Sequence, residues 1–298
     1  MEIRGRLIGA GQPCYIVAEI GINHNGDIEI AKDLMHAAKE AGADAVKFQM
    51  RILTESIPEH MKDRPKNTPW GDMTYYEYKQ HIELSPEVYS SLLYPLAGKL
   101  GLHMGTSVWG RRAAHLAANM IRDESDLDSV FDFIKLPSAL ISDETSLHHT
   151  ATRGLPFFWS TGAHAWHDVY QAKLRLEMYG FNNWGVLHCN SMYPTPNDHL
   201  NLRVIPHWIN YFRPQTVGYS GHETGLATTV AAVALGAQVV ERHITLDRAM
   251  WGSDQAASVE PQGFKRLVRD IRAVEAALGS SEKIVYPEEL AKRKELSP

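Results

Sequence analysis

Residues 15–49, YIVAEIGINHNGDIEIAKDLMHAAKEAGADAVKFQ, hold the local pattern on which the predicted fold rests. The short apolar run Tyr15–Ile20 predicts a buried strand, and Ile28–Ala41 carries apolar residues at helical spacing. Gly42 follows as a typical helix end, and Ala45–Gln49 predicts the next strand. Two strands joined by a helix of this length indicate a βαβ unit with parallel strands.

The same alternation continues along the chain. Further strands are predicted at Leu102–Thr106, Phe133–Leu136, Pro156–Ser160, Trp184–Cys189, Gln215–Tyr219 and Gln238–Arg242. Further helices are predicted at Pro86–Gly101, Arg111–Met120, Asp143–Arg153, His164–Tyr179, Leu202–Phe212, Gly225–Leu235 and Gln262–Leu278. The strands are short and apolar without alternation, which is typical of a parallel sheet covered on both faces.

Eight such units in one chain favour an α/β fold, a (β/α)8 TIM barrel. The alternative is an open Rossmann-type sheet, which would need a GxGxxG turn after the first strand. The chain has EIGINHNG at 19–26 instead. We therefore expect one catalytic barrel at residues 1–279, with an N-terminal β-hairpin near residues 2–10 at its floor.

Two segments depart from the alternation. Residues 51–84 form a long connection with the aromatic stretch TPWGDMTYYEY at 68–78, which we interpret as either a lid or a packed surface loop. The charged tail, residues 280–298, is expected to pack against the outside of the barrel.

Composition excludes several classes of protein. A length of 298 residues is usual for a single barrel, and a net charge of -5 lacks the basic character of nucleic-acid-binding proteins. No run of 18 apolar residues predicts a membrane span, and the N-terminus does not resemble a signal peptide. The two cysteines, Cys14 and Cys189, cannot form a disulfide framework, so we expect a cytoplasmic protein.

Polar side chains gather at the predicted strand ends. Barrel enzymes carry their chemistry at the C-terminal ends of the strands, so these side chains should converge. They include Glu19, Lys47, Gln49, Thr106, Lys135, Ser138, Ser160, Ser191, Tyr193, Ser220, His222 and His243.

Lys47 and Lys135 are cations at the ends of otherwise apolar strands. Burying an ammonium group without a partner is costly. Either each lysine pairs with a neighbouring carboxylate, or the two hold a multiply charged anion. Nearby hydroxyls, and the sequence STG at 160–162 interpreted as opening a helix, add donors suited to phosphate. A small molecule with both a phosphate and a carboxylate would use all of these groups.

His222 follows the seventh predicted strand and His243 ends the eighth. Adjacent strands bring the two imidazoles side by side, and Glu19 lies in the same sector of a closed barrel. Neutral imidazoles are common metal ligands. We predict a divalent metal held by His222 and His243, with Mn, Mg, Co and Zn as the candidates.

Seven segments, in order over nearly the whole chain, resemble the sialic acid synthase family of phosphoenolpyruvate-condensing barrels. They are AEIGINHNG (18–26), GADAVKFQ (42–49), KLPS (135–138), STG (160–162), LHCNSMYPTP (187–196), GYSGH (218–222) and ALGAQVVERHITLDR (234–248). Each alone is a modest signal, whereas seven in family order are specific.

The resemblance implies condensation of phosphoenolpyruvate with a sugar aldehyde to a 3-deoxy-2-keto sugar acid such as a nonulosonate, with release of phosphate. It implies manganese on His222 and His243, and a homo-oligomer, a dimer in the family. Glu19, Lys47, Lys135 and His222 match the family's catalytic positions. Positions matching those around phosphoenolpyruvate are Lys47, Thr106, Lys135, Ser138, Ser160 and Ser220, whereas Gln49, Tyr193 and Asp254 match positions facing the sugar.

The sequence also departs from the family pattern. Ser191 stands where the family has Asn, and Gly221 stands where it has Asp. Family members continue into a small antifreeze-like domain that contacts the N-acetyl group of the sugar, and only the barrel is recognised here. We therefore expect an acceptor other than N-acetylmannosamine: an unacetylated hexose, a pentose or a differently modified hexosamine.

Three alternative functions stay open. A Kdo-8-phosphate- or DAHP-synthase-like enzyme would need a second phosphate site, for which Arg111 and Arg112 are the candidates. A metal-dependent aldolase or isomerase barrel would not need two lysines and several hydroxyls around one site. A non-catalytic binding protein is disfavoured by the retained glutamate, lysines and histidines.

Overall fold

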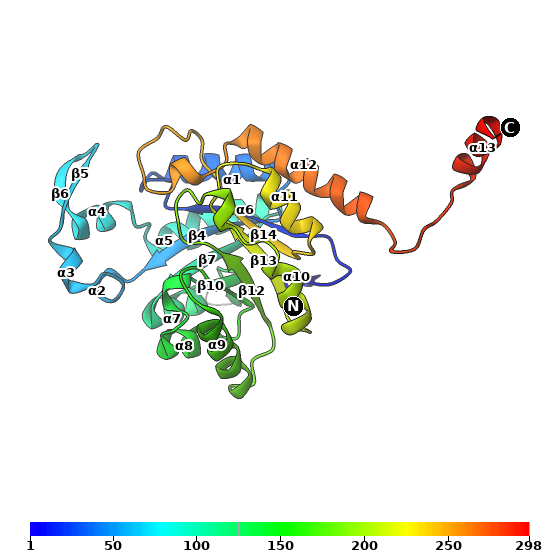
Figure 1. Cartoon of the computed structure of the whole chain (residues 1–298). Helices are drawn as coiled ribbons and strands as arrows, with labels where there is room; N and C mark the ends of the chain where they lie inside the picture. Colours follow the sequence, from blue (N-terminus) through cyan, green and yellow to red (C-terminus); the bar gives the residue numbers. More distant parts are fainter. Residues whose placement is uncertain (124–125, 298) are drawn as a thin grey trace.

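A closed barrel of parallel strands forms the body of the protein (Figure 1). The computed structural model describes residues 1–123 and 126–297. Within them the barrel strands are β3 (Tyr15–Gly21), β4 (Ala45–Arg51), β7 (His103–Trp109), β10 (Phe133–Leu136), β11 (Phe157–Ser160), β12 (Trp184–Cys189), β13 (Thr216–Gly221) and β14 (Val239–His243). Strand β10 pairs with both β7 and β11, which closes the ring. The predicted (β/α)8 TIM barrel is confirmed.

Helices cover the outside of the barrel and pack against its outward-facing side chains. They are α1 (Ile28–Ala41), α5 (Pro86–Val88), η1 (Tyr89–Leu93), α6 (Tyr94–Leu100), α7 (Arg111–Asn119), α8 (Glu144–Ala151), α9 (Trp166–Met178), α10 (Val204–Tyr211), α11 (Ala227–Ala234) and α12 (Pro261–Leu278). Short 3-10 turns lie at η2 (Ser138–Leu140), η3 (Asn197–His199) and η4 (Gln255–Ala257). None of the helices within the described residues is long and apolar enough to cross a membrane.

The predicted N-terminal hairpin is present and lies at the floor of the barrel. It consists of β1 (Glu2–Ile3) and β2 (Arg6–Leu7), paired antiparallel. Ile3 and Ile8 are buried in a cluster with Tyr15, Phe133 and Phe158, which come from the barrel strands. The hairpin therefore closes the end of the barrel opposite the C-terminal ends of the strands.

The long connection after β4 is folded. It contains α2 (Leu53–Ser56), α3 (Glu59–Lys62), β5 (Pro65–Thr68), β6 (Gly71–Thr74) and α4 (Tyr75–Ile82). We call residues 65–82 the β5–α4 lobe; it stands out from the barrel at the left of Figure 1. Trp70 and Tyr78 pack edge-on against Trp251, with ring centroids 5.4 and 5.3 Å apart, respectively. The lobe is thus docked onto the connection between β14 and α12.

Two further elements were not expected from the sequence. Strands β8 (Ile121–Asp123) and β9 (Asp126–Ser129) form a small antiparallel pair after α7. The tail contains helix α13 (Pro287–Leu296). The expectation that it packs against the barrel is wrong: residues 279–297 are all exposed, and α13 lies away from the barrel in Figure 1.

Candidate active site

A cavity of about 210 Å³ opens at the C-terminal ends of the barrel strands. The predicted site residues that line it are Glu19, Lys47, Gln49, Lys135, Ser138, Ser160, Ser191, Tyr193, Ser220, His222 and His243. They come from seven of the eight barrel strands or the loops that follow them. The closed barrel therefore brings these strand-end side chains together, as expected.

Four buried charged groups form the floor of this cavity. The Nζ of Lys47 lies 2.5 Å from Oε2 of Glu19 and donates to Oγ of Ser107 over 2.6 Å. Lys135 forms a short ion pair with Glu241. Each lysine thus has the carboxylate partner that one interpretation of the sequence anticipated. An ammonium group has three donors, so each lysine keeps capacity for a ligand in the cavity.

The two carboxylates differ in acidity because their surroundings differ. Burial raises the pKa of Glu19 to about 7, with the charge of Glu241 adding to the effect and Lys47 opposing it. Burial would also raise the pKa of Glu241, but Lys135 and Lys47 together hold it at about 2. Glu241 therefore stays ionised, and Glu19 can gain or lose a proton near neutral pH. Such a difference in pKa between two neighbouring carboxyl groups is typical of acid–base sites.

The two histidines lie side by side at the mouth of the cavity. Their ring centroids are 5.6 Å apart. The Nδ1 of His222 lies 2.6 Å from the carbonyl oxygen of Asn190, and a carbonyl only accepts, so Nδ1 carries the hydrogen and Nε2 keeps a free lone pair. Burial lowers the pKa of His243 to about 4, and its Nδ1 has no hydrogen-bond partner among the described residues.

These imidazoles fit a metal ion as ligands, because each has a ring nitrogen that makes no hydrogen bond to a described residue. No group of three His, Cys, Asp or Glu residues within the described chain could by itself hold a metal. The protein would therefore supply two nitrogen ligands and leave the remaining positions to oxygen atoms of substrate and water.

The hydroxyl groups form a second wall. The buried Oγ of Ser160 has no hydrogen-bond partner in the described structure, and Oγ of Ser220 donates to Glu241 over 3.1 Å. Ser138 accepts from the backbone N–H of Gly162. A Cβ at Gly162 would lie 2.1 Å from Oγ of Ser191, so only glycine allows this close approach. One expectation is wrong: STG does not open a helix, because α9 begins at Trp166 after an intervening turn.

Two of the three predicted sugar-facing residues, Gln49 and Tyr193, also line the cavity. Gln49 donates to Oε1 of Glu19 over 3.1 Å. Gly21, with φ 56°, leaves room for them: a Cβ there would lie 3.1 to 3.3 Å from Gln49, Glu19 and His243. The ring of Tyr193 stacks on His222 with centroids 4.0 Å apart. Asp254 does not line the cavity, but its Oδ2 lies 3.8 Å from Nδ1 of His243.

Thr106 is placed differently from the prediction. Successive side chains of a strand point to opposite faces, and on β7 it is Ser107 that lines the cavity. Thr106 points to the outer face, like Met104 and Val108 of the helix-covered core, and its hydroxyl bonds the Ser107 carbonyl. The sequence pattern identified the strand end but misassigned the face by one residue.

The predicted site set left out other residues that line the cavity, namely Ser107, Trp109, Pro137, Ala139, Cys189 and Glu241. Glu241 could have been found, because it lies two residues before His243 and so shares its side of β14. Asn23 and His24 follow Glu19 near the end of β3, but they do not line the cavity. Asn23 bonds the Ile244 carbonyl and Ser258, and His24 accepts from the Gly26 backbone.

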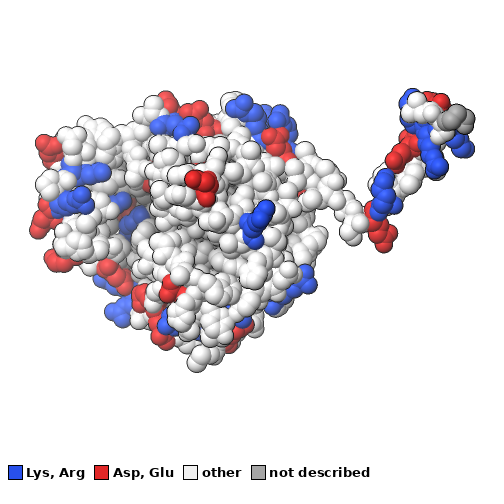
Figure 2. Space-filling model, in the orientation of Figure 1, with Lys and Arg blue, Asp and Glu red and all other residues white. Residues whose placement is uncertain are grey.

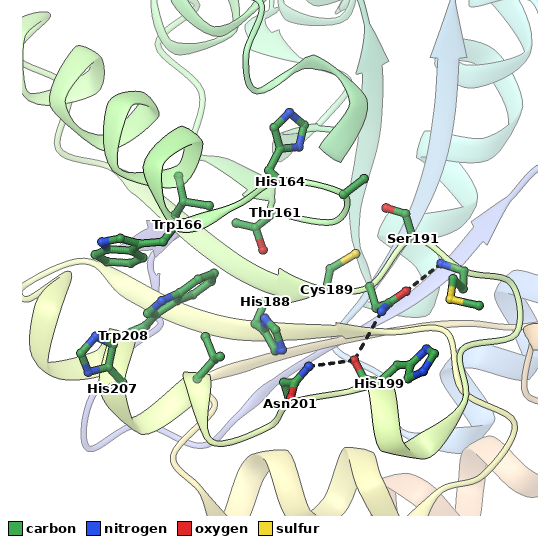
Figure 3. Close-up of a pocket in the computed structure, with 15 residues that line it drawn as sticks. Thr161, His164, Trp166, His188, Cys189, Ser191, His199, Asn201, His207 and Trp208 are labelled. Atoms are coloured by element: carbon green, nitrogen blue, oxygen red, sulfur yellow. Dashed lines mark hydrogen bonds between the residues drawn. The ribbon is translucent and has the colours of Figure 1, made fainter.

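A second, larger cavity of about 790 Å³ adjoins the first and shares Cys189 and Ser191 with it. Figure 3 shows these two residues at one end and Trp166, Trp208 and His207 at the other. Among the described residues that line it there is no Lys, Arg, Asp or Glu. This cavity is therefore suited to uncharged groups.

A closed parallel barrel that gathers paired lysines and glutamates, an acid of raised pKa and two histidines at the C-terminal ends of its strands has the architecture of a barrel enzyme. The chain belongs to the NeuB family, whose model matches residues 34–283.

Named relatives cover almost the whole chain. N-acetylneuraminate-9-phosphate synthase of Mus musculus is 40% identical over 96% of this chain and 77% of its own length. N,N'-diacetyllegionaminic acid synthase of Legionella pneumophila is 36% identical over 92% of this chain and 76% of its own. A sialic acid synthetase of Leptospira borgpetersenii, solved with citrate, has a TM-score of 0.83 at 24% identity over 99% of this chain and 96% of that chain, which shows the shared fold.

Proposed function

We propose that this protein condenses phosphoenolpyruvate with a sugar aldehyde and water to give a 3-deoxy-2-keto sugar acid and phosphate. The named relatives are synthases of sugar acids of this kind. The observation that carries the proposal is the meeting of Lys47, Lys135 and the protonatable Glu19 beside two histidines in one cavity. This set can hold a trianion and move a proton next to it.

Phosphoenolpyruvate binds to the lysine and hydroxyl wall. Lys47 and Lys135 each direct a remaining N–H at the ligand, and the unpartnered hydroxyl of Ser160 donates a further hydrogen bond. Ser138, Ser191 and Ser220 complete this wall. Fixed donors of this kind also stabilise the negative charge that moves onto the departing phosphate.

Glu19 moves the proton. The anionic ligand favours its protonated form, so Glu19 enters the reaction as an acid. C3 of phosphoenolpyruvate bonds to the aldehyde carbon, and Glu19 gives its proton to the aldehyde oxygen. Water then adds at C2 and returns a proton to Glu19. The C2–O bond to phosphate then breaks, the C2 hydroxyl gives its proton to the departing phosphate, and the 2-keto group forms.

His222 and His243 hold the divalent metal in this proposal, with manganese as the first candidate. A bound metal would polarise the aldehyde oxygen as a Lewis acid. His222→Ala should abolish both metal binding, measured by equilibrium dialysis, and turnover. Full activity of the wild type after chelation of all metal would contradict this role.

The alternatives have less support from the geometry. Arg111 and Arg112, the candidates for a second phosphate site in a Kdo-8-phosphate- or DAHP-synthase-like enzyme, do not line the catalytic cavity and instead contact Glu55. An aldolase or isomerase would not release phosphate from phosphoenolpyruvate. We also propose a cytoplasmic location, in keeping with the two free, buried thiols, and a homo-oligomer as in the family.

A phosphate-release screen tests the function. Purified protein, phosphoenolpyruvate and manganese are combined with each of a set of aldoses and amino sugars. Phosphate should appear only when an acceptor aldehyde is present and should match the sugar acid formed. Release without any acceptor, or no release with every acceptor, would contradict the proposal.

A further inference from the structure

The two histidines of the cavity come from neighbouring strands, and their spacing depends on how the ends of these strands are joined. Strands β13 and β14 pair in parallel, and their register ends with Gly221 opposite Arg242. His222 follows this last pair, so the pairing of the two strands does not reach it. His243 is the final residue of β14 and pairs on the other side with Glu19 of β3. Contacts between side chains and backbone must therefore set the spacing of the two imidazoles.

Arg242 makes such contacts. Its side chain neighbours His243 along β14 and points to the opposite face of the strand, away from the cavity. There Nη2 donates to the backbone carbonyl oxygen of Glu223 over 2.5 Å, and Nη1 donates to that of Gly225 over 2.9 Å. Arg242 on one strand thus holds the main chain that directly follows His222 on the other.

The carboxylate of Glu223 fixes this guanidinium in turn. Its Oε1 accepts from Nη1 of Arg242 over 3.0 Å and from the hydroxyls of Thr228 and Thr229 on α11 over 2.9 and 2.7 Å. Its Oε2 accepts from the hydroxyl of Tyr219 over 2.9 Å. Because both carboxylate oxygens have fixed donors, the ion pair is held in one arrangement.

Gly221 leaves room for the same carboxylate. A Cβ there would lie 2.5 Å from Oε2 of Glu223, 2.6 Å from Cε1 of Tyr219 and 3.0 Å from Cδ of Arg242. The space beside the residue that precedes His222 is thus taken up by the ion pair. The main chain on both sides of this histidine is in contact with Arg242 or Glu223.

Both partners of the ion pair are buried. On the face shown in Figure 2, Lys, Arg, Asp and Glu side chains are scattered over the surface, whereas Arg242 and Glu223 are 1% and 0% exposed. Removing two charges from water is costly, and a well-packed apolar pair is often as stable. Stability alone therefore accounts poorly for this ion pair, whereas its directed hydrogen bonds suit a role in positioning.

We propose that Arg242 and Glu223 are positioning residues that set the spacing and angle of the His222 and His243 imidazoles for one metal ion. This inference rests on the proposed function, which assigns the metal to these histidines. Groups that orient metal ligands without touching the metal typically change its affinity roughly ten- to a hundredfold.

Manganese binding tests the inference without any turnover. The dissociation constant for manganese is measured by equilibrium dialysis with the metal alone and no substrate. Glu223→Gln should raise it roughly ten- to a hundredfold. The double variant Arg242→Met/Glu223→Gln buries no charge at these positions, so it should regain most of the stability lost in Glu223→Gln, measured by urea unfolding. Its manganese affinity should nevertheless stay low.

Gly221→Ala gives a second way to disturb the ion pair. The added methyl group should displace the Glu223 carboxylate while both charges remain. This variant should also bind manganese more weakly, so the inference is tested even where the charge-removing variants fail to fold.

Arg272→Met is the matched control. Arg272 also donates to a backbone carbonyl oxygen, that of Cys14 over 2.9 Å, and to a carboxylate, that of Asp44 over 3.2 Å. These two partners directly precede β3 and β4, at the end of the barrel opposite the histidines. Arg272→Met should therefore leave the manganese affinity unchanged.

Affinity for phosphoenolpyruvate separates positioning from general damage. Arg242 and Glu223 do not line the catalytic cavity, so binding of phosphoenolpyruvate in metal-free buffer should change little in the variants. Equal losses of affinity for manganese and for phosphoenolpyruvate would show a purely structural role and overturn the inference.

The outcomes also separate the two proposals. Wild-type manganese affinity in the double variant, or in Gly221→Ala where the double variant does not fold, would overturn the positioning role while the condensation stands. If the wild type bound no manganese, or His222→Ala bound it equally well, the metal site of the proposed function would fail, and this inference with it.

Discussion

At the scale of single residues, the site depends on two carboxylates with opposite pKa shifts. Glu241 faces two lysines and stays ionised, whereas Glu19 is buried beside Glu241 and has a pKa of about 7. A raised carboxyl pKa means that ionised Glu19 is disfavoured in the folded protein. An anion that binds next to Glu19 disfavours this ionised form further.

Binding of phosphoenolpyruvate should therefore take up a proton. At pH 8, in metal-free buffer, Glu19 starts mostly ionised, and the bound anion raises its pKa further. Titration calorimetry in buffers of different ionisation enthalpy should show uptake approaching one proton per site, and affinity should fall as pH rises above 7. Glu19→Gln should show no uptake. Proton release by the wild type would contradict this assignment.

Lys135 is expected to serve both Glu241 and the substrate. Lys135→Met leaves Glu241 without its closest partner and should lower the free energy of unfolding by about 3–5 kcal/mol. The double variant Lys135→Met/Glu241→Gln should regain most of that stability, measured by urea unfolding, but keep a KM for phosphoenolpyruvate raised at least about tenfold. A normal KM in the double variant would mean that Lys135 only neutralises Glu241.

The residues at strand ends were largely predictable because a closed parallel barrel brings all its C-terminal ends together. Sequence alone could not fix the face of Thr106, since one residue of register decides whether it points inward. The ion pair of Lys135 with Glu241 also spans 106 positions in the sequence, so no local pattern reveals it.

At the scale of elements, the hairpin and the lobe differ in how far sequence predicts them. The hairpin β1–β2 was expected, because it precedes the first strand and presents Ile3 to the barrel floor. In the lobe, β5 reads PKNT, and the helices α2 and α3 that precede the lobe have four residues each, so neither periodicity nor propensity identifies them. The apolar packing of the lobe involves Ile22 and Trp251, which are both distant from it in sequence, so no local pattern reveals it.

The hairpin should contribute to stability through its buried side chain. Ile3 is 0% exposed, so Ile3→Ala should lower the free energy of unfolding by about 2–5 kcal/mol. Leu7, on the same hairpin, is 57% exposed, and Leu7→Ala should stay within about 0.5 kcal/mol of the wild type. Equal effects of the two substitutions in urea unfolding would show that the hairpin does not plug the floor.

At the scale of the whole molecule, the barrel was predictable because its eight units repeat one simple pattern. The position of helix α13 was not, since a charged segment with few apolar residues gives no sign of whether a surface exists to receive it. The function depends on the barrel as a whole. Glu19, Lys135 and His222 come from different strands and share one cavity only when the ring is closed.

The central claim concerns which bond of phosphoenolpyruvate breaks, and an isotope measurement tests it. With ¹⁸O in the bridging oxygen between C2 and phosphorus, addition of water at C2 and loss of phosphate should carry the label into the released phosphate. Mass spectrometry should find it there in every turnover with a sugar acceptor. Label retained in the keto-acid product, as in cleavage of the phosphorus–oxygen bond, would contradict the account.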